Sequence, residues 1–116
     1  MRIRLKRIYD DVADDDGYRV LVDRIWPRGV AKKNARLDAW SKELAPSNEL
    51  RRWFGHDRER WEAFCRAYRA ELDECDPQAI DELRRRADTE GLTLLFAARD
   101  TECNNAVVLA DYLESR

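Results

Sequence analysis

Apolar runs and stretches of helical periodicity alternate along this chain. Residues 18–23 (YRVLVD) and 92–98 (LTLLFAA) are nearly continuous apolar runs, which predict two strands that are buried on both faces. Residues 3–9 (IRLKRIY) alternate apolar and basic side chains, which predicts a strand with one solvent-exposed face, at or near a sheet edge. Residues 10–16 (DDVADDD) are rich in acids and lack an apolar stripe, so we expect a solvated loop there.

Helical signals dominate the middle and the end of the chain. Ser47 can cap a helix whose apolar stripe contains Leu50, Trp53 and Phe54 and which ends at Gly55. A long helix is expected from about residue 57 to residue 75, because apolar side chains recur there at spacings of three and four. Asp76 is suited to cap a further helix that runs to about residue 90, and a last helix is expected to end near residue 114.

The segment between the first buried strand and these helices allows two interpretations. Residues 30–35 (VAKKNA) are compatible with one helical turn. Residues 37–44 (LDAWSKEL) place Leu37, Trp40 and Leu44 on one face of a helix, and a short strand explains the pattern nearly as well. Strands that alternate with helices are typical of an α/β fold. We therefore expect a single compact domain, residues 1–116, in which a small, mostly parallel sheet packs with four to five helices.

Composition narrows the classes of protein. The chain of 116 residues carries 22 basic and 24 acidic side chains, for a formal net charge of −2, which disfavours a general nucleic-acid-binding protein. Its apolar runs are far shorter than the roughly 18 residues of a membrane span, and its N-terminus does not resemble a secretory signal. Cys65, Cys75 and Cys103 fit neither a disulfide framework nor zinc-ligand spacing, so we expect a cytoplasmic protein without a metal or cofactor.

Two clusters of polar side chains follow the two buried strands. They are Asp23, Arg24, Trp26 and Arg28 after the first strand, and Arg99, Asp100, Asn104 and Asn105 after the second. If the strands are parallel, both clusters lie at the carboxyl edge of the sheet, where open α/β sheets bind their ligands. Arginine supplies forked N–H donors that suit phosphate and carboxylate groups. We therefore predict a cleft that binds a small anionic ligand, such as a nucleotide, a phosphate ester or a carboxylate.

Roles within this cleft can be assigned from side-chain chemistry. The expected anion-binding residues are the three arginines of the clusters, with Asn104 or Asn105 as further donors and with Trp26 and Trp53 as the wall. Asp23 and Asp100 would orient the arginines or act as general acid and base. The alternative is purely structural, because arginine–aspartate pairs at strand ends often tie loops together.

Two other side chains are candidates for chemistry. His56 is the only histidine and could move a proton, although a histidine beside Gly55 also suits a helix boundary. Cys103 is expected in the first turn of the last helix, where the helix dipole would lower the pKa of its thiol. Cys65 falls on an apolar helical stripe and is expected to pack as a small apolar residue.

Four stretches resemble the YeaO-like branch of the bacterial domain-of-unknown-function 488 family, and together they span most of the chain. They are YRVLVDRIWPRGV, LAPSNELRRWFGHD, RWEAFCRAYRAEL and LTLLFAARDTECNNAVVLADYL. The resemblance implies a compact α/β fold and a cytoplasmic bacterial protein, with no established activity. By position, the family signature falls on Asp23, Arg24, Trp26, Pro27, Arg28, Gly29, Pro46, Ser47, Trp53, Phe54, His56, Arg99, Asp100, Asn104 and Asn105. Other branches have cysteines near the second strand end, where this chain has alanine and arginine, and this difference argues against thiol chemistry.

Three functional hypotheses stay open at this point. The first is the anion-binding cleft, with or without turnover of the ligand. The second is a nucleic-acid-associated module that uses exposed aromatic side chains together with Lys32, Lys33, Arg36 and Arg51. The third is a protein-interaction module that has no small ligand.

Overall fold

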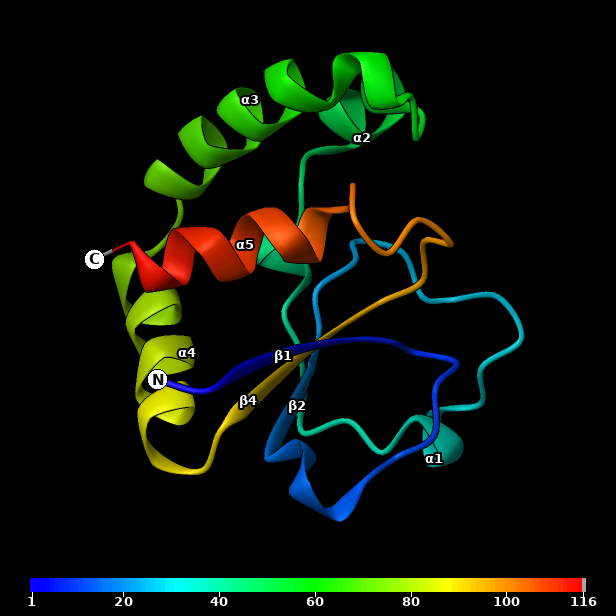
Figure 1. Ribbon diagram of the computed structural model, residues 1–116, viewed down its shortest axis with the longest axis vertical. Helices are drawn as coiled ribbons and strands as arrows, with labels where there is room; N and C mark the ends of the chain where they lie inside the picture. The colour runs from blue at the N-terminus through cyan, green and yellow to red at the C-terminus, as the bar shows by residue number, and fades with distance from the viewer. Residues whose placement is uncertain (116) are drawn as a thin grey trace.

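Four parallel strands form one twisted sheet, with helices packed against it (Figure 1). The computed structural model describes residues 1–115. The strands are β1 (Ile3–Arg7), β2 (Tyr18–Leu21), β3 (Ala39–Trp40) and β4 (Leu92–Phe96), in the spatial order β1-β4-β2-β3. The predicted α/β fold is confirmed, and so is the edge position of β1.

Five helices accompany the sheet. They are α1 (Lys32–Ala35), α2 (Asn48–Phe54), α3 (Trp61–Asp73), α4 (Pro77–Thr89) and α5 (Asn105–Glu114). The predicted caps are present, because Ser47 accepts a hydrogen bond from the Leu50 amide and Asp76 accepts one from the Gln78 amide. The helix expected from residue 57 to residue 75 is shorter, since residues 58–60 form a 3-10 turn before α3 begins.

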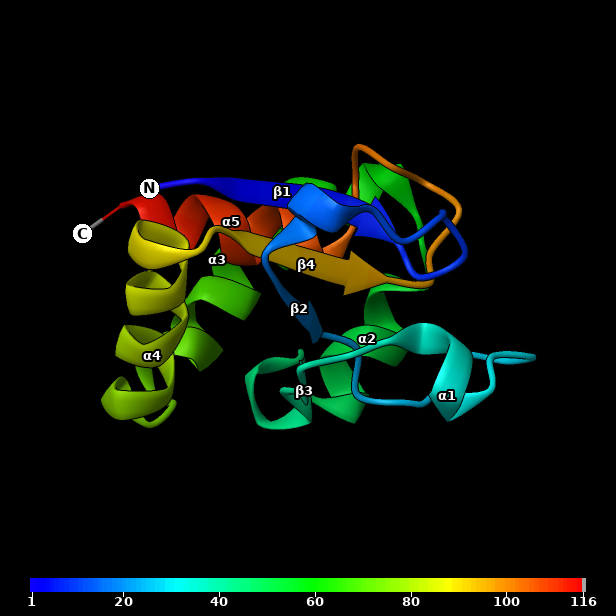
Figure 2. The same ribbon diagram turned by 90° about the horizontal axis from the view of Figure 1, so that it is seen from below.

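The central strands β2 and β4 are buried on both faces, and their alternate residues supply two separate apolar clusters. Val20, Leu94 and Phe96 lie in the larger cluster, which contains the inner faces of α2, α3, α4 and α5. Leu21 and Leu95 point to the opposite face, where they pack in a smaller cluster with the α1 region. Figure 2 shows α1 and β3 together on the side of β2 away from β1. This double coverage explains why β2 and β4 are continuous apolar runs.

Residues 37–44 divide between these two clusters, which excludes a single helix. Leu37 and Trp40 pack with the smaller cluster, whereas Leu44 is buried in the larger one. The chain achieves this with the short strand β3 followed by a 3-10 turn at residues 42–44. Of the two interpretations left open by the sequence, the strand is the one observed.

Most of the acidic segment 10–16 is exposed, as expected for a solvated loop, but its last residue is not. It ends in a 3-10 turn, and the Asp16 carboxylate is buried beside Arg19, at 2.5 Å from Nη1, and Lys6, at 3.1 Å from Nζ. The Thr93 hydroxyl donates to the Asp16 carbonyl at 2.6 Å, which holds this segment against the sheet. The segment therefore covers polar positions of β2 and β4 that would otherwise face solvent.

The helices of residues 1–115 are all too short or too polar to cross a lipid bilayer.

Candidate functional site

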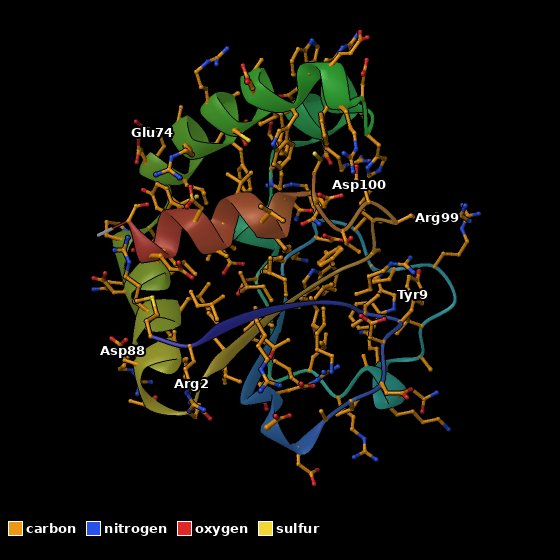
Figure 3. The ribbon with its side chains drawn as sticks, viewed as in Figure 1. Arg2, Tyr9, Glu74, Asp88, Arg99 and Asp100 are labelled. Carbon is orange, nitrogen blue, oxygen red and sulfur yellow. The ribbon has the colours of Figure 1, made fainter. Side chains whose placement is uncertain are left out.

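The polar ends of β2 and β4 meet at one edge of the sheet, as the sequence predicts for parallel strands. Tyr18 pairs with Leu92 and Leu21 pairs with Leu95 in parallel register, so both strands end at the same level. One oxygen of Asp23, after β2, accepts a hydrogen bond from the Ala97 amide, after β4, at 3.0 Å. Figure 3 shows Arg99 and Asp100 at the end of the molecule opposite Arg2.

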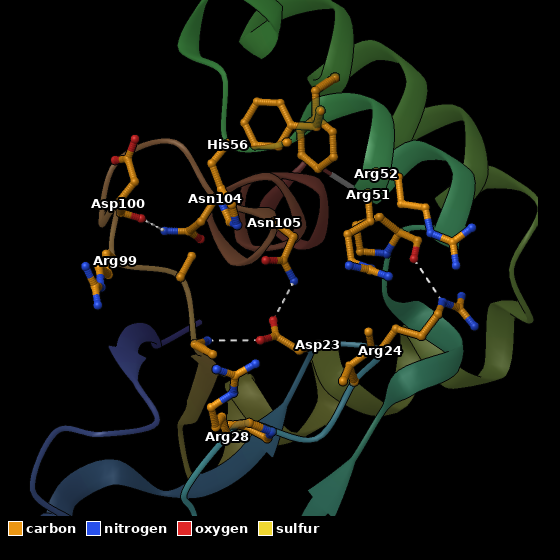
Figure 4. A pocket seen from close by; sticks show the side chains of 18 of the residues that line it. Asp23, Arg24, Arg28, Arg51, Arg52, His56, Arg99, Asp100, Asn104 and Asn105 are labelled. Atoms are coloured by element: carbon orange, nitrogen blue, oxygen red, sulfur yellow. Dashed lines mark hydrogen bonds between the residues drawn. The ribbon is translucent and has the colours of Figure 1, made fainter.

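A cleft of about 920 Å³ opens at this edge. Three parts of the chain enclose it: the loop after β2, the carboxyl end of α2 with the following turn, and the segment from β4 into α5. The lining includes Asp23, Arg24, Trp26, Arg28, Arg51, Arg52, His56, Arg99, Asp100, Asn104 and Asn105 (Figure 4). All residues predicted for the anion cleft, together with His56, therefore line one cleft, except Trp53. Trp53 was expected on the apolar stripe of its helix, but its side chain is exposed outside the lining, with the Arg60 guanidinium 5.2 Å from the centroid of its ring. Cys103 does not line the cleft either.

Asp23 and Asn105 form the floor of the cleft. The Asn105 Nδ2 donates to the Val22 carbonyl at 2.9 Å and to the Asp23 Oδ1 at 3.1 Å. Burial raises the pKa of the Asp23 carboxyl, and the hydrogen bonds from the Ala97 amide and from Asn105 offset this rise only in part. Each Asp23 oxygen accepts one N–H group, and these two hydrogen bonds fix the carboxyl at the floor of the cleft.

The arginines predicted to bind an anion differ in how they are held. Arg24 donates to the Pro46 carbonyl at 2.9 Å and to the Ala45 carbonyl at 3.2 Å, so it anchors the loop after β2 to the start of α2. Within residues 1–115, the guanidinium groups of Arg28 and Arg99 contact no carboxylate and donate no hydrogen bond. The N–H donors of Arg28 and Arg99 are therefore available to a ligand, whereas two N–H donors of Arg24 are already bonded to backbone carbonyls.

Asp100 pairs with an arginine that the sequence reasoning did not single out. Arg58 donates to its two oxygens at 2.9 and 2.8 Å, and the Glu102 and Cys103 amides donate to Oδ1. The hydrogen bonds from Arg58 and these amides lower the pKa of Asp100 to about 2. Asp100 is consequently ionised at neutral pH, which is unfavourable for a general acid, and it orients Arg58 rather than Arg28 or Arg99.

The two asparagines have separate tasks. Asn104 is buried and caps α5: its side chain accepts from the Val107 amide at 3.1 Å and donates to the Asp100 carbonyl at 2.9 Å. Asn105 is partly exposed and faces the cleft beside Asp23 (Figure 4). Of this pair, Asn105 is therefore the better placed to touch a ligand.

Trp26, in the loop after β2, and His56, in the turn after α2, both line the cleft. The Trp26 Nε1 donates to the Val30 carbonyl at 2.8 Å, and its ring packs edge-on against Trp40 at a centroid distance of 5.3 Å. His56 has a φ of 58°, in the left-handed region that a non-glycine residue seldom adopts. Gly55, at φ 52°, ends α2 in the same region, and together these two residues turn the chain so that the imidazole lies at the cleft.

Arg51 and Arg52 are the main residues of the cleft that the sequence reasoning did not assign to it. Arg51 entered only the nucleic-acid hypothesis. Both side chains are exposed and line the cleft from the last turn of α2, while Leu50 and Phe54 of the same helix are buried in the core. The amphipathic pattern predicted that Arg51 and Arg52 lie off the core face, but not that this part of α2 borders the strand ends.

The prediction that Cys103 lies in the first turn of the last helix is wrong, because α5 begins only after the cap at Asn104. Burial raises the pKa of the Cys65 and Cys75 thiols, which disfavours reactive thiolates there. All three cysteines are free. Within residues 1–115, no three His, Cys, Asp or Glu side chains lie close enough together to hold a metal ion.

Comparison with known proteins identifies the family. Residues 2–116 match the family described as the inactive DUF488-N3 subclade. The chain belongs to this family. It is 46% identical over 118 residues to the uncharacterized protein YeaO of Escherichia coli, and this alignment covers 99% of each chain. It is 44% identical over 115 residues to the uncharacterized protein Rv3073c of Mycobacterium tuberculosis, covering 99% of this chain and 96% of that relative. No solved structure matches the chain significantly. The DUF488 resemblance inferred from the sequence is thus confirmed.

Proposed function

We propose that this DUF488 protein binds a small organic anion in the cleft at the carboxyl edge of its sheet, without converting it. The observation that supports the proposal is that four arginines of the cleft form no ion pair. Arg28, Arg51, Arg52 and Arg99 all line this cleft, and none of them forms an ion pair with a residue of the described chain. Arg2, Arg36 and Arg66 also lack such an ion pair but lie outside the cleft, whereas Arg58, Arg69 and Arg86 each contact a carboxylate. An acidic chain that leaves the four cleft arginines unpaired in one concave site favours an anionic ligand there.

Binding without turnover is favoured by the structural hydrogen bonds that the two candidate acids accept. The Asp23 carboxylate accepts hydrogen bonds from the Ala97 amide and from Asn105. The Asp100 carboxylate accepts hydrogen bonds from Arg58 and from two backbone amides. Both carboxylates thus serve to fix the loops that carry Arg28 and Arg99. The description of the family as inactive agrees with this assignment. We further propose a cytoplasmic location, since three free cysteines suit a reducing compartment.

Thermal unfolding in the presence of inorganic phosphate, citrate and a set of phosphorylated metabolites tests the proposal. A ligand at about one hundred times its Kd stabilises the folded state by about 2.7 kcal/mol. For a domain of this size we expect a rise in Tm of roughly 10 °C.

The variants Arg28→Gln and Arg99→Gln should lose this rise. The control is Arg66→Gln, which removes the same charge from an exposed position of α3 outside the cleft. If no anion raises the Tm of the wild type, or if all three variants lose the rise equally, the proposed function is wrong. A steep loss of DNA or RNA binding with salt would instead support the nucleic-acid hypothesis.

A further inference from the structure

Positive side chains lie on both sides of the Asp23 carboxylate in the cleft, and this arrangement restricts where a ligand can carry its negative charges. In Figure 4, Arg28 lies on one side of Asp23 and Arg51 and Arg52 lie on the other. Arg28 comes from the loop after β2, whereas Arg51 and Arg52 come from α2, so the two positive sides belong to different elements. A ligand that crosses the cleft therefore meets a cation, then the Asp23 carboxylate, then a second cationic group.

The floor between the two positive sides offers hydrogen-bond acceptors. Each Asp23 oxygen accepts one hydrogen bond, from the Ala97 amide or from Asn105, and a carboxylate oxygen has room for a second. The Asn105 Nδ2 already donates to the Val22 carbonyl and to Asp23. Its Oδ1 accepts no hydrogen bond from residues 1–115. An anionic group over this floor is repelled, whereas a hydroxyl or amino group there can donate.

The size of the cleft suits an organic ligand better than a lone inorganic anion. Its volume of about 920 Å³ lies near the upper end of the roughly 300–1,000 Å³ typical of sites for organic ligands. Exposed Ile25 and partly buried Trp26 supply apolar surface beside Arg28 in the same lining. A larger organic molecule can use this surface and reach both positive sides at once.

We propose that the ligand carries two anionic groups, one bound by Arg28 and one by Arg51 and Arg52, joined by a middle part whose hydroxyl or amino groups donate to Asp23 and Asn105. This inference rests on the proposed function and narrows it to one chemical class, of which sugar bisphosphates are a simple example.

Isothermal titration calorimetry at low ionic strength with matched probes tests the inference. The probes are two bisphosphates with hydroxyl groups in their middle part, fructose 1,6-bisphosphate and ribulose 1,5-bisphosphate, together with fructose 6-phosphate and with hexane-1,6-diol bisphosphate, which lacks donors in its middle part. At least one hydroxylated bisphosphate should bind about tenfold or more tighter than fructose 6-phosphate, and also tighter than the hexanediol compound.

Single substitutions test the role of each positive side and of the floor in binding. Arg28→Gln and Arg52→Gln should each reduce the affinity for the preferred bisphosphate to that for the monophosphate, while Arg66→Gln leaves the ratio between them unchanged. Asp23→Asn, which keeps an acceptor for the Ala97 amide, should remove the preference for a hydroxylated middle part.

The outcomes separate this inference from the proposed function. If the monophosphate and every bisphosphate bind equally, or if only inorganic phosphate or citrate binds, the two-anion ligand is wrong while anion binding at the cleft is retained. If Arg28→Gln and Arg52→Gln lower the affinity no more than Arg66→Gln does, the effect is bulk electrostatics and the inference is overturned. If no anion binds at all, both proposals are wrong.

Discussion

Asp16 belongs to a buried ion network, and its removal should destabilise the fold strongly. Its carboxylate lies 2.5 Å from Arg19 Nη1 and 3.1 Å from Lys6 Nζ, and it accepts a hydrogen bond from the Ala13 amide at 3.1 Å. The Arg19 side chain is only 5% exposed, so Asp16→Ala leaves a buried guanidinium without a carboxylate. Removing one partner of a buried ion pair costs roughly 3–5 kcal/mol. That cost is a large part of the roughly 5–15 kcal/mol by which a typical domain is stable.

Urea unfolding followed by tryptophan fluorescence measures this loss. With an m-value of roughly 2 kcal/mol per molar urea, Asp16→Ala should lower the unfolding midpoint by about 1.5–2.5 M. Asp15→Ala is the matched control, because Asp15 lies in the same turn but is exposed, where its contact with Arg4 at 2.8 Å contributes little. A drop below about 0.5 M for Asp16→Ala, or an equal drop for Asp15→Ala, would refute the reasoning.

The same network gives the protein a specific sensitivity to acid. Burial by itself raises the pKa of Asp16, but hydrogen bonds from the Ala13 amide, Lys6 and Arg19 outweigh it and lower the pKa of the carboxyl. A group with a lowered folded pKa stabilises the protein above its unfolded pKa, near 3.9 for aspartate, and this contribution is lost as the pH falls toward the folded pKa. The difference in urea midpoint between wild type and Asp16→Ala should therefore be full at pH 7 and shrink below about pH 4. A difference that stays constant down to pH 2 would contradict this account.

Two further predictions concern packing. Gly17→Ala should lower the Tm far more than Gly29→Ala: both glycines have positive φ, but a Cβ at Gly17 would lie 2.4 Å from the Gly91 carbonyl oxygen, whereas one at Gly29 meets no atom within 4 Å. Equal losses of Tm would show that the close approach of the two chain segments is unimportant. Tyr68→Phe should cost roughly 1–3 kcal/mol in urea unfolding, because the buried hydroxyl donates to the Leu44 carbonyl at 2.6 Å and that carbonyl would lose its partner. An unchanged midpoint would mean that water replaces the hydroxyl.

Local patterns predicted most of the fold because the helices and the two central strands depend on local chemistry. Ser47 and Asp76 were identified as caps from residue type and position alone, and α2 and α4 begin directly after them. Strands that alternate with helices predicted a mostly parallel sheet, and the structure shows that β2 and β4 are parallel neighbours within it. Helix caps and buried strands can be recognised without knowing which parts of the chain pack together.

The errors fall where a residue's environment depends on distant parts of the chain. Asp16 stands in the same acidic run as Asp14 and Asp15, and nothing in that run distinguishes it. The available signal was Arg19, a basic residue inside the apolar run of β2, because a charged side chain in a buried strand requires a nearby partner. Similarly, Arg58 gave no local sign that it would bind Asp100, which is 42 positions further along the chain.

In the candidate site, too, the features set by local sequence could be predicted, whereas those set by distant packing could not. The strand ends could be placed at one sheet edge, because parallel strands bring their carboxyl ends together. The orientation of α2 could not be placed, since a helix with Leu50 and Phe54 on its core face can border the cleft on either side. The observed packing brings Arg51 and Arg52 to the cleft and leaves Trp53 outside it.

On the proposed function, the structural roles of the two candidate acids agree with anion binding without turnover in a family described as inactive. Asp23 joins the ends of β2 and β4 through the Ala97 amide, and Asp100 joins the loop after β4 to Arg58. Both contacts fix the backbone that carries Arg28 and Arg99, so each acid has a task that does not depend on proton transfer. On the proposed function, the separation of these roles has a measurable consequence: Asp100→Asn should weaken anion binding through a looser loop after β4, and an added Arg58→Gln should weaken it little further, because the two residues act as one tie.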